Sequence, residues 1–259
     1  MKKLVRKFSF LALALVGLVS CDEKDNETPK SPTVMVFTTA EDVDAKLAGF
    51  RSTLGDSLNT KPGKTSGRRE VNWDAVPATF TNTNTFPFDF FNSPDPTLPA
   101  GRKRGILFNH PGATFRISDT NFNDVDPSYS TQFATFSPAK TFATISSTVT
   151  EVTFKVPGTN QDAFVKGFGA IFSDVDLPSS TTMEFFNGDK SLGIYPVKPR
   201  SGASSFSFLG VYFPDDKVTS VKIHAGNAKI AAGSTDTATY DVVVMDDFLY
   251  NEPIANTNQ

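Results

Sequence analysis

The stretch DAFVKGFGAIFSDVD, residues 162–176, decides the fold of this 259-residue chain. Side chains alternate between the two faces of a β-strand, and both faces of this stretch are apolar. One face carries Phe168 and Phe172, and the other carries Gly167, Gly169 and Ile171. A strand that is apolar on both faces is typical of the middle layer of a packed fold, and the paired glycines predict that another segment packs closely against them.

The chain from residue 68 onward consists of short strand-like runs. Most of the 25 Phe residues lie there, in alternating patterns separated by Pro, Gly, Asn or Asp. Asn187-Gly188-Asp189 lies between two such runs and predicts a tight hairpin. After an edge strand at 34–37, we expect strands near residues 69–73, 86–91, 104–109, 113–118, 131–136, 141–146, 149–156, 163–173, 181–187, 191–197, 205–213, 218–225 and 240–249. This pattern predicts an all-β, jelly-roll-like β-sandwich that forms a single domain over residues 33–259.

One N-terminal amphipathic helix is expected ahead of these strands. Its apolar stripe follows spacings of four, three and four positions: Val43, Leu47, Phe50 and Leu54. Thr39 is predicted to cap the helix with Asp42 at its third position, and Gly55 is predicted to end it. We expect this helix to pack on the sandwich or to close one of its ends.

Residues 1–20 have the pattern of an export signal. Four basic residues precede an apolar segment at 8–19 that is too short to cross a membrane with normal flanks. Leu18-Val19-Ser20-Cys21 resembles the lipobox of bacterial lipoproteins, which implies cleavage before Cys21 and lipidation of this only cysteine. An ordinary cleaved signal that happens to contain a cysteine is the alternative.

Residues 21–32 contain charged residues and prolines, which predicts a flexible tether. Acidic residues directly after Cys21 resemble the surface-export signal of Bacteroidetes-type lipoproteins, so we expect an outer-membrane lipoprotein at the cell surface. The alternative is that the tether is simply polar. Removal of residues 1–20 moves the net charge from −3 to −7. An acidic domain without a basic run argues against nucleic acid as a partner, and the membrane contact is expected from the lipid on Cys21.

Nearly the whole mature chain resembles an uncharacterised family of exported bacterial β-sandwich domains found in PEP-CTERM-type and lipoprotein-type secreted proteins. The resemblance rests on segments in order along the chain, among them GRREVNWDAVP (67–77), RGILFNHPGATFRIS (104–118), GFGAIFSDVD (167–176), MEFFNGDKSLG (183–193) and VVVMDDFLYNEP (242–253). It implies a jelly-roll-like fold and an extracytoplasmic location. It brings no established activity and no catalytic residue.

Pairs of acidic residues suggest a hard cation. Ca²⁺ takes six to eight oxygen ligands, which Asp side chains and loop carbonyls supply readily. The preferred candidates are Asp174 with Asp176 and Asp246 with Asp247, and two further pairs are Asp124 with Asp126 and Asp215 with Asp216. Neighbouring strand residues face opposite ways, so one of Asp246 and Asp247 is expected to point inward. The run VMDDF also resembles the last strand of many carbohydrate-binding jelly rolls, where an Asp ligates structural calcium. One structural Ca²⁺ is therefore one hypothesis for these acids, and solvated or Arg-paired carboxylates are the other.

Aromatic residues provide the remaining functional signal. Trp73, Tyr129, Tyr195 and Tyr212 are candidates for a face on which sugar rings stack, and burial in the core is the alternative. The leading hypothesis is a non-catalytic binding module for extracellular glycan. A structural or adhesive surface lipoprotein without a small ligand is the second hypothesis.

A glycoside-active enzyme is the third hypothesis. It would need two carboxyl groups across a cleft. Glu70 and Asp74 flank Trp73, but an ion pair of Glu70 with Arg68 or Arg69 explains the same residues. We expect no enzymatic activity.

Overall fold

The computed structural model describes residues 33–109, 112, 114–201 and 205–257. Seven strands form the larger sheet: β1 (Met35–Thr39), β2 (Arg68–Val71), β4 (Phe115–Ser118), β5 (Thr141–Thr144), β8 (Gly167–Ser173), β11 (Phe206–Tyr212) and β13 (Val244–Asn251). Five form the second sheet: β3 (Ile106–Asn109), β6 (Val149–Phe154), β9 (Thr182–Asn187), β10 (Lys190–Pro196) and β12 (Ser220–His224). A small third sheet pairs β7 (Ala163–Phe164) with β14 (Ile254–Ala255). The predicted signal, Cys21 and the tether lie outside the described residues.

The larger sheet has the order β1-β11-β8-β13-β5-β4, with β2 paired to β13, and the second has the order β10-β9-β12-β6-β3. All strand pairs within these two sheets are antiparallel. Their inner faces share one apolar core, where Phe154 of β6 lies 6.2 Å from Phe168 of β8 and 5.6 Å from Tyr250 of β13 between ring centroids. The expected all-β sandwich is therefore confirmed.

Strand β8 lies in the middle of the larger sheet, as its two apolar faces predicted. It pairs with β11 on one side and β13 on the other, and all seven of its residues are buried. Phe168 and Phe172 point into the core between the sheets, whereas Ile171 packs on the opposite side.

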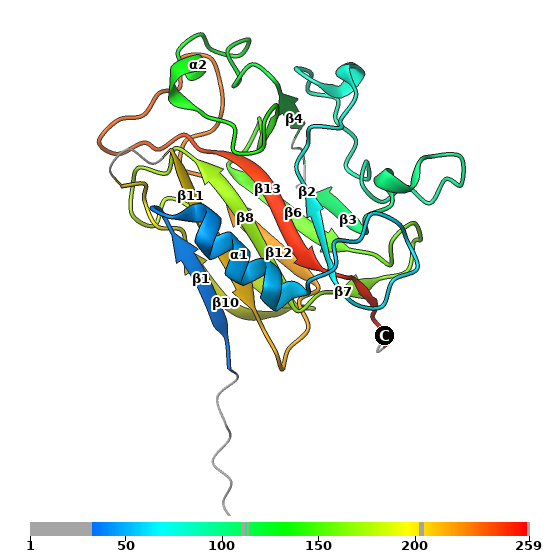
Figure 1. Cartoon of the computed structure of the whole chain (residues 1–259). Coiled ribbons are helices and arrows are strands. Elements are labelled where there is room, and N and C mark those ends of the chain that lie inside the picture. The colour runs from blue at the N-terminus through cyan, green and yellow to red at the C-terminus, as the bar shows by residue number, and fades with distance from the viewer. Residues whose placement is uncertain (1–32, 110–111, 113, 202–204, 258–259) are drawn as a thin grey trace, which may run out of the picture. The chain divides into compact units, whose positions relative to one another are not determined.

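Helix α1 (Val43–Leu54) lies across the outer face of the larger sheet, over β11, β8 and β13 (Figure 1). Its four predicted apolar residues are buried. The expected cap at Thr39 is wrong, because Thr39 is still the last residue of β1. Asp42 caps the helix instead, and its Oδ1 accepts a hydrogen bond of 2.9 Å from the backbone N–H of Ala45.

Two predicted strands are absent from the described structure. Residues 86–91 form turns, which allow Phe86, Phe90 and Phe91 to enter the same core, an arrangement that strand alternation prevents. Residues 131–136 overlap the short helix α2 (Tyr129–Gln132) and the segment that follows it. Tyr129 and Phe133 lie four positions apart there, with ring centroids at 5.1 Å.

The remaining short elements are two 3₁₀ turns, at Ala78–Phe80 and Ala100–Arg102. The predicted hairpin is confirmed, since Asn187 pairs with Lys190 and Gly188 adopts a positive φ of 58°. Among the described residues, no helix is long and apolar enough to cross a membrane.

Candidate functional site

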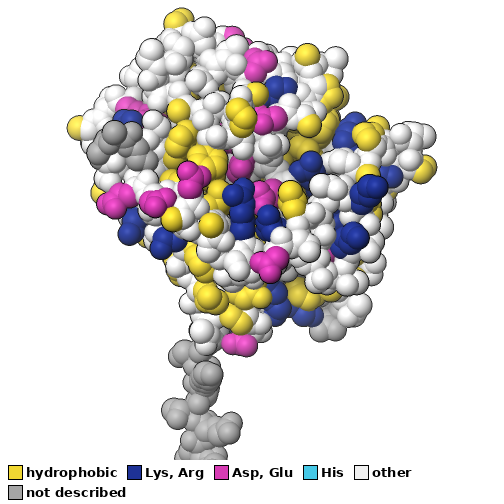
Figure 2. Space-filling model, in the orientation of Figure 1, with side chains coloured by type: hydrophobic (Ala, Val, Ile, Leu, Met, Phe, Trp, Pro, Cys, Tyr) yellow, Lys and Arg dark blue, Asp and Glu magenta, His cyan; other side chains and the backbone are white. Residues whose placement is uncertain are grey.

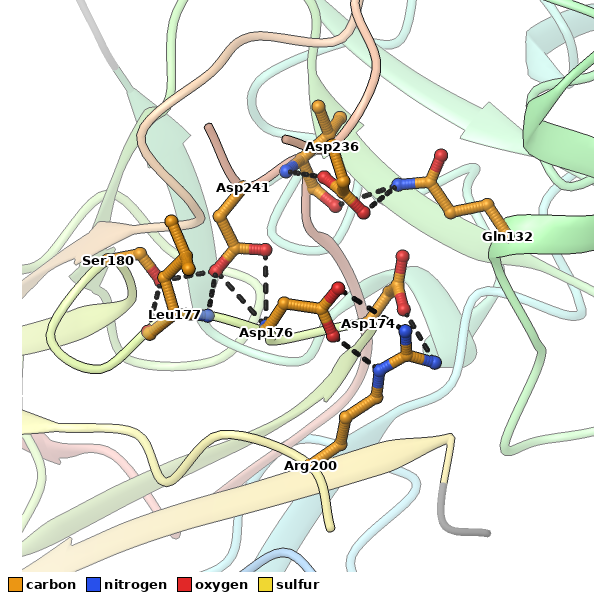
Figure 3. Close-up of polar contacts among 9 residues, drawn as sticks. Gln132, Asp174, Asp176, Leu177, Ser180, Arg200, Asp236 and Asp241 are labelled. Atoms are coloured by element: carbon orange, nitrogen blue, oxygen red, sulfur yellow. Dashed lines mark hydrogen bonds and ion pairs between the residues drawn. The ribbon is translucent and has the colours of Figure 1, made fainter. Parts of the chain in front are cut away.

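Three carboxylates meet where strand β8 ends. Asp174 and Asp176 follow the last residue of β8, and Asp236 reaches them from the long segment between β12 and β13 (Figure 3). One oxygen from each lies within 4.8 Å of the other two. Asp236 is held in place from two sides, because its carboxylate accepts hydrogen bonds from the backbone N–H of Val242 at 2.6 Å and from Nε2 of Gln132 at 2.7 Å.

Arg200 is the cation that faces this cluster. Its Nη1 lies 2.9 Å from Oδ1 of Asp174, and its Nε donates a hydrogen bond of 2.5 Å to Oδ1 of Asp176. Asp174 is 1% exposed, and neither of its oxygens accepts a hydrogen bond from the described residues. Burial, opposed in part by Arg200, raises the pKa of Asp174 to about 7. Burial also raises the pKa of Asp236. One guanidinium thus faces three carboxyl groups.

A fourth acid, Asp241, fixes the chain next to the cluster. It is fully buried and accepts hydrogen bonds from the backbone N–H groups of Asp176 and Leu177 and from the hydroxyl of Ser180. Burial raises the pKa of Asp241. Its partners are all supplied by the chain, so Asp241 acts as a structural anchor for residues 176–180.

Asp246 and Asp247 form a separate buried carboxyl pair, with exposures of 0% and 4%. The expectation that they point to opposite faces is wrong. The pairing of β13 with β8 shifts between Met245 and Phe248, and this β-bulge brings the two carboxyl groups into contact with each other. Burial, followed by the charge of Asp247, raises the pKa of Asp246 to about 9. The raised pKa of both groups favours a proton shared between the two carboxyl groups at neutral pH.

The Asp174–Asp176–Asp236 cluster and the Asp246–Asp247 pair lie at different positions along the strands of the larger sheet. Val244 pairs with Ser173, at the end of β8 where the cluster begins, whereas the bulge lies farther along β13, beside the middle of β8. The sequence pattern identified Asp174 and Asp176 but missed their third partner. Asp236 lies in the run STDTA, outside any strand, and no local pattern marks it.

The other acidic pairs have local partners or face solvent. Asp124 forms an ion pair with Arg116, and Asp126 accepts hydrogen bonds from Ser128 and from the N–H of Gly233. Asp215 is exposed.

The four candidate aromatic residues do not share an exposed face. Trp73 is 1% exposed and stacks on Phe142 with ring centroids 4.4 Å apart. Tyr129 is fully buried, and its hydroxyl donates to backbone carbonyls. Tyr195 packs half-buried against the main core, whereas Tyr212 packs on the α1 side of the larger sheet. Burial rather than a stacking surface explains Trp73 and Tyr129.

Glu70 belongs to an ion-pair network rather than to a cleft. It pairs with Arg51 of α1 and with Arg68, each at 2.7 Å, while Arg69 pairs with the buried Glu252. Figure 2 shows basic and acidic side chains side by side in the middle of the face that α1 covers. Asp74 accepts a hydrogen bond of 3.1 Å from the backbone N–H of Lys140, so the two carboxylates near Trp73 are both engaged in structural contacts.

The outer side of the five-stranded sheet offers a different surface, which we call the open face. Two cross-strand rows of side chains define it. One row is Ile194, Glu184, Lys222, Glu151 and Asn109, and the other is Ser191, Phe186, Ser220, Thr153 and Leu107. All of these residues are half-buried or exposed, and those on β3, β6, β9 and β12 alternate with buried neighbours.

Hollows lie along this open face. One hollow of about 280 Å³ is lined by Glu151, Thr153, Phe186, Lys222 and neighbouring residues of the same sheet and its hairpin. A larger one of about 500 Å³ lies beside His224 and is walled by residues 177–180. The sequence TMEFFN at 182–187 indicates that the side chain of Phe186 faces outward. Neighbouring strand residues face opposite sides, and Phe185 faces the core.

Comparison of the chain with family models, with curated proteins and with solved structures found no match.

Proposed function

We propose that this protein is a lipid-anchored, extracytoplasmic binding module of jelly-roll type that binds glycan on the open face. The lipid on Cys21 would hold it at the outer membrane, on the cell surface, as the lipobox-like sequence and the acidic tether suggest. The two sheets differ in a way that supports this assignment. Helix α1 covers the outer side of the larger sheet, whereas the outer side chains of the smaller sheet remain accessible and line hollows.

The observation that carries the proposal is the chemistry of the open face. Phe186 provides an aromatic ring, and Nζ of Lys222 lies 5.6 Å from its centroid. Lys222 also lies 3.8 Å from Glu151, and Ser191 donates a hydrogen bond of 2.7 Å to Glu184. Sugars present C–H surfaces that stack on rings and hydroxyl groups that bond to carboxylates, amides and ammonium groups. An accessible sheet surface that holds one ring among such groups and is lined by hollows suits an extended glycan.

A structural or adhesive surface protein is the second candidate. Strand β1 forms an edge of the larger sheet, and its Met35 and Val36 are 39% and 48% exposed. An edge strand with exposed apolar residues favours pairing with another chain. This candidate predicts self-association or protein binding without glycan binding.

A glycan array probed with the full chain in detergent tests the proposal. We expect a restricted set of related glycans to bind, and to be recovered unchanged after incubation, because the proposed module is non-catalytic. Absence of binding to every glycan contradicts the proposal, and cleavage of a bound glycan contradicts its non-catalytic part. Self-association measured by light scattering, together with an empty array, supports the second candidate instead.

A further inference from the structure

We propose that Asp174, Asp176 and Asp236 form a binding site for one divalent cation, of which Ca²⁺ is the preferred ion, and that Arg200 occupies this place when the ion is absent. The site is distinct from the open face and does not depend on the glycan proposal. Its three carboxylates come from two segments more than fifty residues apart in the sequence, with one oxygen of each within 4.8 Å of the others. A cation would join these segments directly.

The burial of the Asp174 carboxylate without hydrogen-bond donors also points to a ligand at this site. Its side chain is 2% exposed, and neither oxygen accepts a hydrogen bond from the described residues. A buried carboxylate normally recruits several donors, as Asp241 does a few residues away. Asp174 has the ion pair with Arg200 and a contact with Asp236, which is itself a carboxyl group, and its Oδ2 accepts no hydrogen bond from the described residues. Burying such an oxygen is costly unless a cation or a proton satisfies it.

The neighbouring groups suit a hard cation. Asp176 is partly accessible, with a side-chain exposure of 31%, so an ion can enter from its side. Gln132 donates its amide N–H to Asp236 and so holds this carboxylate in place beside the other two. Oxygen ligands in a loop-built cage favour Ca²⁺ over metals that prefer nitrogen or sulfur.

Arg200 is the group that a cation must displace. Its side chain is 39% exposed and bridges Asp174 and Asp176, so it can swing into solvent when an ion takes its place. Arg200 and the ion thus compete for the same oxygens. A purely structural ion pair makes the opposite prediction, namely that loss of Arg200 weakens the cluster and creates no new affinity for an ion.

The test is titration of the chelator-treated full chain with Ca²⁺ by calorimetry, with a parallel titration with Mg²⁺. We expect one Ca²⁺ per chain. Asp236→Asn and Asp176→Asn should each weaken binding at least tenfold, whereas Arg200→Gln should bind as tightly as the parent or more tightly. Asp215→Asn, which changes an exposed acid away from the cluster, serves as the matched control and should bind like the parent.

Thermal unfolding of each variant without added ion shows whether it is folded, and Asp176→Asn is the milder change if Asp236→Asn fails to fold. Two results overturn the proposal. In the first, neither the parent nor Arg200→Gln binds Ca²⁺ stoichiometrically. In the second, Ca²⁺ binds, but Asp176→Asn and Asp236→Asn leave the affinity unchanged. In the first case the cluster is an ion pair, and in the second the ion lies elsewhere.

Discussion

Phe50 of α1 packs directly over Gly169 of β8. A Cβ atom on Gly169 would lie 2.7 Å from Cε1 of Phe50 and 3.0 Å from the Cα of Gly210 in the neighbouring strand. The missing side chain therefore lets the helix approach the sheet closely enough for Phe50 to become fully buried. This contact explains why the central strand carries glycine on the face that α1 covers.

Replacing this glycine should destabilise the fold. Gly169→Val forces a branched side chain into the space that Phe50 fills, and overpacking of this kind costs about 1–3 kcal/mol or more. The melting temperature should fall by several degrees, measured by circular dichroism. Gly101→Ala is the control, since a Cβ there meets no atom within 4 Å. An unchanged melting temperature for Gly169→Val would show that the helix does not depend on this contact.

The buried ion pair of Arg69 and Glu252 should be sensitive to loss of one partner. Nη2 of Arg69 lies 2.7 Å from Oε1 of Glu252, and the side-chain exposures are 0% and 1%. Glu252→Gln leaves the guanidinium buried without a counter-charge, so we expect a loss of about 3–5 kcal/mol in chemical denaturation. Asp162→Asn, in the more exposed pair with Lys155, should cost less than about 1 kcal/mol. Equal effects of the two variants would contradict this account.

The carboxyl pair of β13 predicts a pH dependence of stability. Burial and Asp247 raise the pKa of Asp246 to about 9, so the folded protein holds a proton that the unfolded chain releases above pH 4. This contribution to stability is fully present below about pH 4 and declines as the pH rises toward 9, by at most about 1.4 kcal/mol per pH unit for one proton.

Asp246→Asn imitates the protonated form and keeps an oxygen acceptor for the N–H of Phe136. This variant should therefore be more stable than the parent at pH 8 and similar to it near pH 4, as measured by urea denaturation. A stability difference that does not vary between these pH values would mean that Asp246 does not carry the proton.

The lipid anchor is tested through Cys21, the only cysteine. Cys21→Ser should accumulate as an uncleaved precursor, or as one cut elsewhere, and should fail to partition into detergent. The measurement is phase partitioning with mass determination of the mature chain. If the variant matures and partitions like the parent, the anchor is not on this residue.

Periodic patterns in the sequence predicted most of the architecture. The buried central strand, the apolar stripe of α1 and the hairpin at Gly188 follow from local spacing, and all three are present. The incorrect strand predictions have their cause in tertiary packing, which local spacing does not show. A turn places Phe86, Phe90 and Phe91 in the core around Trp73, and nothing in a run of aromatic residues distinguishes this arrangement from a strand.

The candidate sites were predicted less well, because they depend on contacts between distant segments. Asp236 joins Asp174 and Asp176 only through the path of the chain between β12 and β13. The contact of Asp246 with Asp247 depends on a β-bulge, which strand alternation does not include. The aromatic candidates were selected by residue type, whereas Phe186 becomes apparent only once the inward and outward residues of β9 are assigned.

The most direct test of the central claim compares three proteins on the same glycan array: the parent chain, Phe186→Ala on the open face, and Lys46→Ala on the exposed side of α1. We expect the parent and Lys46→Ala to bind the same glycans equally. Phe186→Ala should bind them about tenfold more weakly, which corresponds to about 1.4 kcal/mol, while its melting temperature stays close to that of the parent. If no glycan binds the parent, or if Phe186→Ala binds as tightly as the parent, the open face is not a glycan-binding surface.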